Sequence, residues 1–328
     1  MDQIIIGIDI GGTTIKIGFF NEDGDIVHKW QIPTNKEAQG AHIVNDIWNS
    51  VSTKLSEFQM DKKIMGIGVG APGFVDNKRG FIYEAVNIGW VDIDLAKQFA
   101  MYTEVPVFVE NDANLAALGE NWKGAGNKAE NLIAVTLGTG VGGGIIANGS
   151  ILSGVNGTAG EIGHAVGDPN GYPCNCGRVG CLDTIASGPG LVQQAMDKIN
   201  ANPTSNLATF HSTKGYITAK DIFDLASKDD EICKRIIERT AETLGVALAN
   251  AATVINPSKI LIGGGVSNAG EQLLNIVRNS FEKYSLTRVH QECEIQIAQL
   301  GNDAGIIGAA YLILQETNKS MTEGDVTK

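Results

Sequence analysis

Basic side chains are in short supply in this chain. Of its 328 residues, 25 are Lys or Arg and 37 are Asp or Glu, so the formal net charge is −12. Proteins bind nucleic acids mainly through clustered Lys and Arg that contact the phosphates, and the sequence contains no such cluster. Binding of a nucleic acid is therefore disfavoured.

Long apolar runs are also missing. The N-terminal segment MDQIIIGIDIGG has no basic start, and its apolar run is too short for a signal peptide. The longest weakly polar stretch, residues 245–255, falls well short of the ~20 residues that cross a bilayer. We therefore expect a soluble, cytoplasmic protein without a membrane partner.

Cysteine is scarce as well, yet it is concentrated. Three of the five cysteines lie in HAVGDPNGYPCNCGRVGC, residues 164–181, together with His164. A disulfide, a reactive thiol and a metal site would each explain this spacing. Disulfides are rare in the cytoplasm, so metal binding or catalysis is favoured. Cys233 and Cys293 lie in helical and strand-like contexts and are interpreted as ordinary structural residues.

Glycine, by contrast, is abundant and unevenly placed. The chain has 41 glycines, and four segments are especially rich in them: residues 6–18, 66–73, 137–144 and 261–267, each at the end of a short apolar run. This pattern predicts strands that end in tight glycine turns. Helical periodicity lies between them, at residues 41–58, 113–122 and 230–255. Alternating strands and helices indicate an α/β protein.

Two segments of the chain are similar to each other. Residues 4–26 and 131–151 both follow the order strand, glycine turn, strand, turn, strand. This similarity predicts two related α/β domains, a smaller one over 1–115 and a larger one over 116–300. A helix at about 301–316 is expected to pack back on the first domain, and the tail 317–328 is expected to be disordered.

The first glycine turn has the chemistry of a phosphate-binding loop. It is not a P-loop, because no Gly-Lys-Ser/Thr follows, and the residues after it alternate like a strand, unlike a dinucleotide fingerprint. The bare backbone of Gly11 and Gly12 and the hydroxyls of Thr13 and Thr14 can surround phosphate oxygens. Asp9 is placed to hold Mg²⁺ through water. A plain β-hairpin is the alternative interpretation.

Two further glycine turns complete a set. The second turn repeats the first in the other half of the chain, and the third follows the strand-like segment KILI and precedes a helix expected at 271–281. The candidate nucleotide residues in these turns are Gly138, Thr139, Gly140, Gly142, Gly263, Gly264 and Gly265. The three turns resemble the phosphate-1, phosphate-2 and adenosine motifs of the sugar kinase/actin superfamily. This resemblance implies a two-domain, ribonuclease H-like fold that binds ATP in an interdomain cleft.

Asp112 is the candidate general base, because phosphoryl transfer to a hydroxyl needs a carboxylate near the attacking oxygen. It follows a strand expected at 105–110 and precedes an alanine-rich helix. Asn111 or Asp112 would also serve as an ordinary helix N-cap. The other candidate residues for the acceptor are uncharged or acidic, which suits a neutral polyol: Gly73, Asn87, Asn111, Glu161 and His164.

Four motifs in this order resemble the ROK family (repressors, open reading frames, kinases): ENDANLAALGE, LGTGVGGG, GTAGEIGH and CNCGRVGCLD. The resemblance runs from Asp9 to about Tyr311 and is strongest to the family's bacterial ATP-dependent glucokinases. It implies Mg²⁺- and ATP-dependent phosphorylation of glucose at its 6-hydroxyl, and a homodimer or homotetramer. It also adds Asp183 to the sugar-binding residues.

The same resemblance gives the cysteine-rich loop a role. It implies that His164, Cys174, Cys176 and Cys181 bind a structural Zn²⁺, a closed Cys₃His set that leaves no position for water. The chain departs from the family in one place, because Asp183 stands where Glu is usual. The shorter acid leaves the strictness of hexose choice open.

Two other functions fit parts of the pattern. A ROK kinase for N-acetylmannosamine, N-acetylglucosamine or fructose would have the same motifs. A non-catalytic sugar-sensing repressor would carry a DNA-binding domain before the first phosphate motif, whereas Asp9 already lies in that motif here. Asp112 also favours the enzyme. Polyphosphate as donor would need a basic channel, which this acidic chain does not offer.

Overall fold

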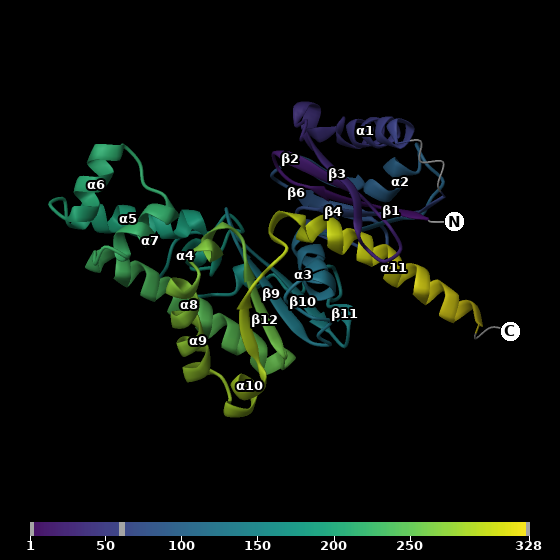
Figure 1. The fold of residues 1–328 in the computed structure, drawn as a ribbon. Helices are drawn as coiled ribbons and strands as arrows, with labels where there is room; N and C mark the ends of the chain where they lie inside the picture. Colours follow the sequence, from purple (N-terminus) through teal and green to yellow (C-terminus); the bar gives the residue numbers. More distant parts are fainter. Residues whose placement is uncertain (1–2, 59–62, 326–328) are drawn as a thin grey trace. The chain divides into compact units, whose positions relative to one another are not determined.

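The computed structural model describes residues 3–58 and 63–325 and divides the chain into two compact units (Figure 1). Unit 1 contains Met1–Lys128, Ile151–Gly160 and Asn302–Lys328, and unit 2 contains Ala129–Ser150 and Glu161–Gly301. The first division thus falls after Lys128 and not near residue 115. The reason is that helix α3 (Asp112–Lys123) packs against α11 (Ala304–Asp325) and so belongs to unit 1.

Unit 1 is built on a five-stranded sheet in the order β3-β2-β1-β4-β8. β1 pairs antiparallel with β2 and parallel with β4, and β4 pairs parallel with β8. The strands are β1 (Ile4–Ile10), β2 (Thr14–Phe20), β3 (Ile26–Pro33), β4 (Ile64–Ala71) and β8 (Val107–Asn111). The parallel strands β1, β4 and β8 therefore end at the same edge of the sheet.

The two faces of this sheet are covered differently. Ile6, Ile8 and Ile10 alternate toward a core that they share with α1 (Ile43–Glu57) and α2 (Leu95–Phe99). On the other face α11 lies against β1 and β4. Gly68 permits this contact, because a β-carbon there would lie 2.0 Å from the carbonyl oxygen of Ala309. Unit 1 is therefore a sheet with helices on both faces (Figure 1).

A second, smaller sheet follows the turn after β4. It contains β5 (Phe74–Asp76), β6 (Phe81–Ala85) and β7 (Trp90–Asp94), paired antiparallel in that order. These strands were not predicted from the sequence. They are three to five residues long and carry charged side chains, so their apolar alternation is too short to be recognised.

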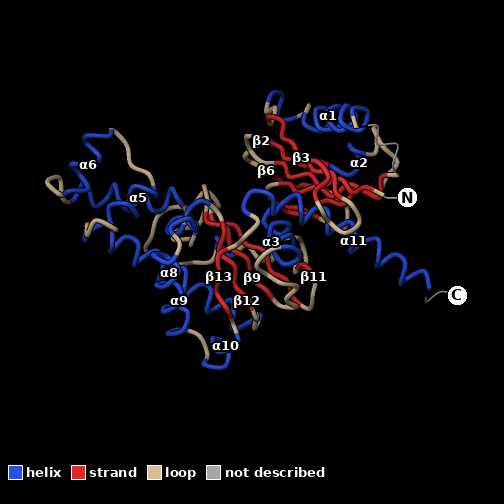
Figure 2. Tube along the Cα trace, viewed as in Figure 1, coloured by secondary structure: helices blue, strands red, loops and turns tan. Residues whose placement is uncertain are grey.

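Unit 2 repeats the strand order of unit 1. Its sheet runs β11-β10-β9-β12-β13, with β9 antiparallel to β10 and parallel to β12. Figure 2 shows the strands of this sheet in red, with β9, β11, β12 and β13 labelled. The strands are β9 (Leu132–Leu137), β10 (Val141–Ala147), β11 (Ser150–Ile151), β12 (Lys259–Gly263) and β13 (Glu294–Ile297). The predicted pair of related α/β folds is present.

The helices of unit 2 form a cluster around the long helix α8, which packs against α9, α7 and α5. They are α4 (Asp183–Ala186), α5 (Gly188–Ala201), α6 (Asn206–Lys214), α7 (Ala219–Ala226), α8 (Glu231–Ile255), α9 (Glu271–Tyr284) and α10 (Thr287–Glu292). Short 3₁₀ turns are η1 (Glu37–Gly40), η2 (Ile162–His164), η3 (Gly265–Ala269) and η4 (Gly301–Asp303). The helices predicted at 41–58, 113–122, 230–255 and 271–281 correspond to α1, α3, α8 and α9.

The C-terminal segment differs from its prediction. Helix α11 continues to Asp325, so residues 317–325, expected to be disordered, are helical, and residues 326–328 lie outside the described part of the chain. Across residues 3–58 and 63–325, every helix lacks the combination of length and apolar character that a membrane crossing requires.

Candidate functional site

Most candidate residues of unit 1 gather where its parallel strands end. β4 ends at Ala71, opposite Asn111 of β8, and Asp9 of β1 lies opposite Gly70 of β4. A β-carbon on Gly70 would lie 3.7 Å from the Cα of Asp112. The carboxyl edge of a parallel sheet is the usual ligand-binding edge of α/β folds.

The first phosphate motif forms the tight turn between β1 and β2. The amide of Gly11 donates to the carbonyl oxygen of Thr14 at 3.1 Å, and Thr13 is exposed at the tip. The loop after β3 is tied to this turn, because the amide of Thr34 donates to Thr13 O at 2.9 Å and its hydroxyl to Gly11 O at 2.7 Å. The turn is thus fixed on both sides while its tip remains accessible.

Asp9 is held in a shielded position beside this turn. Its carboxylate is 17% exposed and lies 3.5 Å from Nζ of Lys16, its cross-strand partner. Burial raises the pKa of Asp9, and the ammonium group of Lys16 opposes that rise. A carboxylate with one weak counter-charge suits a divalent cation, which would favour its ionised form.

Asn111 and Asp112 perform different tasks at the start of α3. Asn111 is the N-cap, and its side-chain oxygen accepts from the amides of Ala113 and Asn114 at 2.9 and 3.2 Å. Its Nδ2 donates to Gly73 O at 3.0 Å. Asp112 is the first residue of the helix, and its Oδ1 accepts from the amide of Ala113 at 2.8 Å. Of the two capping candidates, the structure assigns the cap to Asn111.

Glu110 stabilises the end of β8, next to the cap, through several hydrogen bonds. It is 2% exposed and accepts hydrogen bonds from Nδ2 of Asn77, Nδ2 of Asn114 and its neighbour's amide, at 2.8, 3.0 and 2.9 Å. Glu110 is not among the predicted site residues. The sequence did contain a signal for this role, because Glu110 ends a buried strand directly before the helix cap. A buried carboxylate in such a place must be hydrogen-bonded.

Gly73 and Asn87 bring the small sheet to the same edge. Gly73 has φ +88°, and a β-carbon there would lie 1.9 Å from Glu84 O, so the turn requires glycine. Asn87 lies in the turn between β6 and β7, and its Cβ is 3.5 Å from the position a β-carbon on Gly12 would occupy. Asn87 therefore lies next to the first phosphate turn.

In unit 2 the second phosphate motif forms the turn between β9 and β10. The amide of Gly138 donates to Gly140 O at 2.9 Å, and Gly138 O accepts from the amide of Gly188 at the start of α5. Thr139 is exposed at the tip, like Thr13 in unit 1, and Gly142 lies in β10 opposite Thr136.

The adenosine motif lies beside that turn. Gly263 ends β12 and is paired with Thr136 of β9, and Gly265 begins η3. Gly264 has φ +84°, and a β-carbon there would lie 2.5 Å from Leu137 O. The second phosphate turn and the adenosine motif thus share the carboxyl edge of the sheet in unit 2.

Asp183 contacts the phosphate turn directly. Its Oδ1 accepts from the amide of Val141 at 2.6 Å and would lie 2.8 Å from a β-carbon on Gly140. This contact was not expected for a residue assigned to the sugar. It connects the end of the cysteine-rich loop with the second phosphate turn.

Glu161 directly precedes the turn η2, and His164 is its last residue. Burial raises the pKa of Glu161, and the nearby His164 opposes that rise. The amide of His164 donates to Glu161 O at 3.0 Å, which closes the turn. Nδ1 of His164 lies 3.8 Å from Sγ of Cys174, so Nε2 is on the other side of the ring.

His164, Cys174, Cys176 and Cys181 form one cluster, and their ligand atoms all lie within 4.8 Å of one another. The chain reverses between Cys174 and Arg178, whose backbones are joined by a 2.8 Å hydrogen bond, and this reversal brings the cysteines together. Sulfurs around a tetrahedral zinc are separated by about 3.8 Å, since Zn–S bonds are about 2.3 Å long. The donor set therefore fits Zn²⁺.

The pKa values of two thiols in this cluster are shifted in opposite directions. Hydrogen bonds from Arg178 lower the pKa of Cys176 to about 6, whereas burial raises the pKa of Cys181 to about 12. Their sulfurs lie 3.5 Å apart, well beyond the ~2.05 Å of a disulfide. No disulfide joins these three cysteines.

Comparison with known proteins agrees with these features. Residues 5–316 match the model of the ROK family. A glucokinase of Halalkalibacterium halodurans is 50% identical over 100% of this chain and 99% of its own length, and one of Thermotoga maritima is 34% identical over 94% and 96%. The fold is similar to that of a ROK family glucokinase from Streptomyces griseus in complex with glucose and AMPPNP. For that structure the TM-score is 0.76 and the identity 36%, over 95% of this chain and 99% of the other. These similarities confirm the predicted two-domain sugar kinase fold, and the chain belongs to the ROK family.

Proposed function

We propose that this chain is a glucokinase, which transfers the γ-phosphoryl group of ATP to O6 of glucose and releases ADP, glucose 6-phosphate and a proton. The observation that carries the proposal is the division of tasks at α3, where Asn111 caps the helix and Asp112 lies at the carboxyl edge of the sheet. Full-length similarity to glucokinases supports the choice of substrate.

Asp112 acts as the general base. It accepts the proton of the 6-hydroxyl as O6 attacks the γ-phosphorus and the bond to ADP breaks. Asp112 lies in the first turn of α3, where the electropositive helix N-terminus interacts favourably with a carboxylate. Glu110 and Asn111 hold the backbone that presents it.

ATP is bound by the three glycine motifs. The exposed hydroxyls and bare amides of the two phosphate turns contact its phosphates, and the backbone at Gly264 and Gly265 lies along the adenosine. Mg²⁺, held near Asp9, supplies charge neutralisation to the phosphates.

The sugar is bound by neutral and acidic groups: Gly73, Asn87, Asn111, Asp112, Glu161, His164 and Asp183. Zn²⁺ is structural and holds the loop between His164 and Cys181. Nδ1 of His164 faces the sulfur of Cys174, which leaves Nε2 free to donate to a sugar hydroxyl. The use of ATP as donor implies that the enzyme acts in the cytoplasm. We expect a homodimer or homotetramer, which a measurement of the molecular mass in solution would test.

Another hexose is the second candidate for the acceptor. The reason is Asp183, whose shorter side chain already hydrogen-bonds to Val141 N and which stands where Glu is usual. A looser contact with the sugar would admit N-acetylmannosamine, N-acetylglucosamine or fructose.

A panel of these sugars in an ADP-release assay decides between the candidates. Glucose is expected to give the highest kcat/KM. A higher value for another hexose would replace glucose as the substrate. Sugar binding without ADP release from any hexose would contradict catalysis and indicate a sugar sensor.

A further inference from the structure

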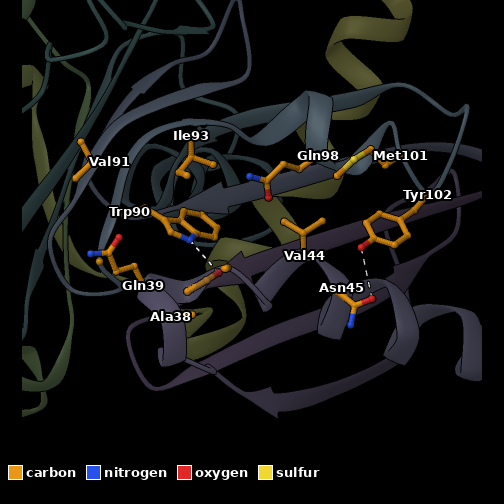
Figure 3. A pocket seen from close by; sticks show the side chains of 13 residues that line it. Ala38, Gln39, Val44, Asn45, Trp90, Val91, Ile93, Gln98, Met101 and Tyr102 are labelled. Atoms are coloured by element: carbon orange, nitrogen blue, oxygen red, sulfur yellow. Dashed lines mark hydrogen bonds between the residues drawn. The ribbon is translucent and has the colours of Figure 1, made fainter.

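Unit 1 contains a pocket that none of the candidate nucleotide or sugar residues lines. Its volume is about 400 Å³, within the range of small-molecule sites. It lies between η1 and the start of α1 on one side and β7 and α2 on the other (Figure 3).

The lining of this pocket is uncharged, although 19% of the chain is charged. Trp90, Tyr102 and Val44 supply rings and apolar surface, and Gln39, Asn45 and Gln98 supply amide groups (Figure 3). A phosphate or carboxylate would meet no Lys or Arg among these lining residues. A neutral molecule with both an apolar part and hydrogen-bonding groups matches the lining.

Two hydrogen bonds connect the walls of the pocket. Trp90 is 2% exposed, and its Nε1 donates to Gly40 O at 3.1 Å. Tyr102 Oη donates to Asn45 Oδ1 at 3.4 Å. Each of these bonds joins one wall to the other, so a ligand bound between the walls is linked to the positions of both.

One wall has an unusual backbone. Ala38, Gln39 and Gly40 have φ values of +50°, +58° and +71°, so three successive residues are left-handed. For Ala and Gln this conformation is strained, and such strain tends to occur at ligand-binding segments. The Gly40 carbonyl, held in this way, meets the indole of Trp90.

Both walls are continuous with the candidate site. The segment before η1 is anchored at Thr34 to the first phosphate turn, by the two hydrogen bonds to Thr13 and Gly11. The segment on the other wall carries Asn87 two residues before Gly89, and a β-carbon on Gly89 would lie 3.4 Å from Gln39 Cα. A ligand that shifts either wall would move Asn87 or the phosphate turn.

We propose that this pocket is a regulatory site for an uncharged small molecule that combines a ring with amide or hydroxyl groups. Its occupancy changes the affinity for glucose through the segment that carries Asn87. The proposed binding site depends only on the pocket, whereas the proposed change in glucose affinity also rests on the proposed function.

The probe for binding is N-acetyl-L-phenylalaninamide, with anionic N-acetyl-L-phenylalanine as its matched counterpart. Titration calorimetry on the full chain, saturated with glucose to fill the sugar site, should show binding of the amide. The acid should bind at least ~10-fold more weakly, because its carboxylate would be desolvated without a partner. No binding of the amide, or equal binding of both, would overturn the site.

Two variants locate the bound probe. Gln98→Trp fills the pocket from α2, whereas Lys97→Trp adds the same bulk at the next, exposed position, which does not line the pocket. Only Gln98→Trp should abolish binding. Met101→Trp, at a lining residue that is 72% exposed, repeats the test if Gln98→Trp does not fold. Equal loss in the Lys97→Trp control would contradict the assignment.

The regulatory effect is measured separately, as the Kd for glucose with and without the amide probe. A change of about 5-fold or more is expected in the wild-type chain, as for ordinary coupling between sites, and none in Gln98→Trp. Probe binding with an unchanged glucose Kd would overturn regulation. Probe binding by a chain that phosphorylates no hexose would contradict the proposed function and leave the site standing.

Discussion

At the scale of single residues, the start of α3 separates structural and chemical tasks between neighbours. Asn111 satisfies the helix amides and holds the Gly73 carbonyl, and Glu110 fixes the strand end beneath it. Asp112 can therefore be altered without removing the cap. This separation makes its role testable in a folded protein.

Replacing Asp112 with Asn should abolish turnover while sparing the sugar site. We expect kcat to fall by at least ~10²-fold, the usual size of general-base assistance, with little change in the Kd for glucose. Coupled ADP release and calorimetry measure the two quantities. Near-normal kcat would leave Asp112 without a catalytic role.

The control for that experiment is Asn111→Ala. It removes the N-cap and should lower the free energy of unfolding by about 1 kcal/mol, which urea titration measures. Asp112→Asn should lower it much less. Similar losses in both variants would mean that Asp112 shares the cap.

Asp9 gives a prediction with a pH dependence. Because burial raises its pKa, the folded state binds its proton more tightly than the unfolded chain does. The resulting stability is fully present below the unfolded pKa of ~3.9 and is lost as pH rises through the folded pKa. Asp9→Asn should therefore gain stability relative to wild type as pH rises from about 4 to neutrality, while losing Mg-ATP affinity. Urea titrations of both proteins at about pH 4 and at neutral pH test this prediction. A stability of Asp9→Asn that falls relative to wild type between these two pH values would contradict it.

At the scale of elements, the glycine turns show what the sequence could predict. A hairpin that closes at Ile10 and Ile15 places Lys16 opposite Asp9, so this ion pair could have been found by counting along the strands. The hydrogen bond from Val141 to Asp183 could not, because it joins segments 42 residues apart whose approach depends on the loop between them. The left-handed run at Ala38 and Gln39 was equally hidden, since neither residue type favours that conformation.

The cysteine-rich loop should carry one Zn²⁺ per chain, as elemental analysis of protein kept in reductant would show. If Zn²⁺ orders this loop beside the sugar-binding residues, Cys176→Ser should weaken glucose binding more than ATP binding. The Cys176→Ser variant should also lose some affinity for ATP. The reason is that Asp183, at the end of this loop, hydrogen-bonds to Val141 of the second phosphate turn. Calorimetry of both ligands tests this, with Cys293→Ser as a control outside the cluster. A metal-free protein with unchanged affinities would refute the zinc site.

At the scale of the whole molecule, unit 1 is assembled from three separate parts of the chain, and its last element is α11. The boundary near residue 115 was misplaced because local patterns do not report that α3 and α11 pack together. The contact is made through small residues: β-carbons on Gly119 and Gly308 would lie 2.2 and 1.8 Å from the carbonyl oxygens of Ala304 and Leu115. Sequence shows such glycines but not their neighbours.

Gly308→Ala tests whether this close contact holds unit 1 together. Helix propensity alone would make the variant more stable by ~1 kcal/mol, since Ala is the better helix former. Packing predicts the opposite, because a β-carbon 1.8 Å from a carbonyl oxygen forces the helices apart, and overpacking costs about 1–3 kcal/mol or more. The steric effect should win, with a net loss in the free energy of unfolding and faster hydrogen exchange in α3, β1 and β4 than in the strands of unit 2.

Gly265→Ala is the control, because a β-carbon there meets no atom within 4 Å. A Gly308→Ala variant more stable than wild type would show that α11 can shift without loss, and that unit 1 does not depend on this contact.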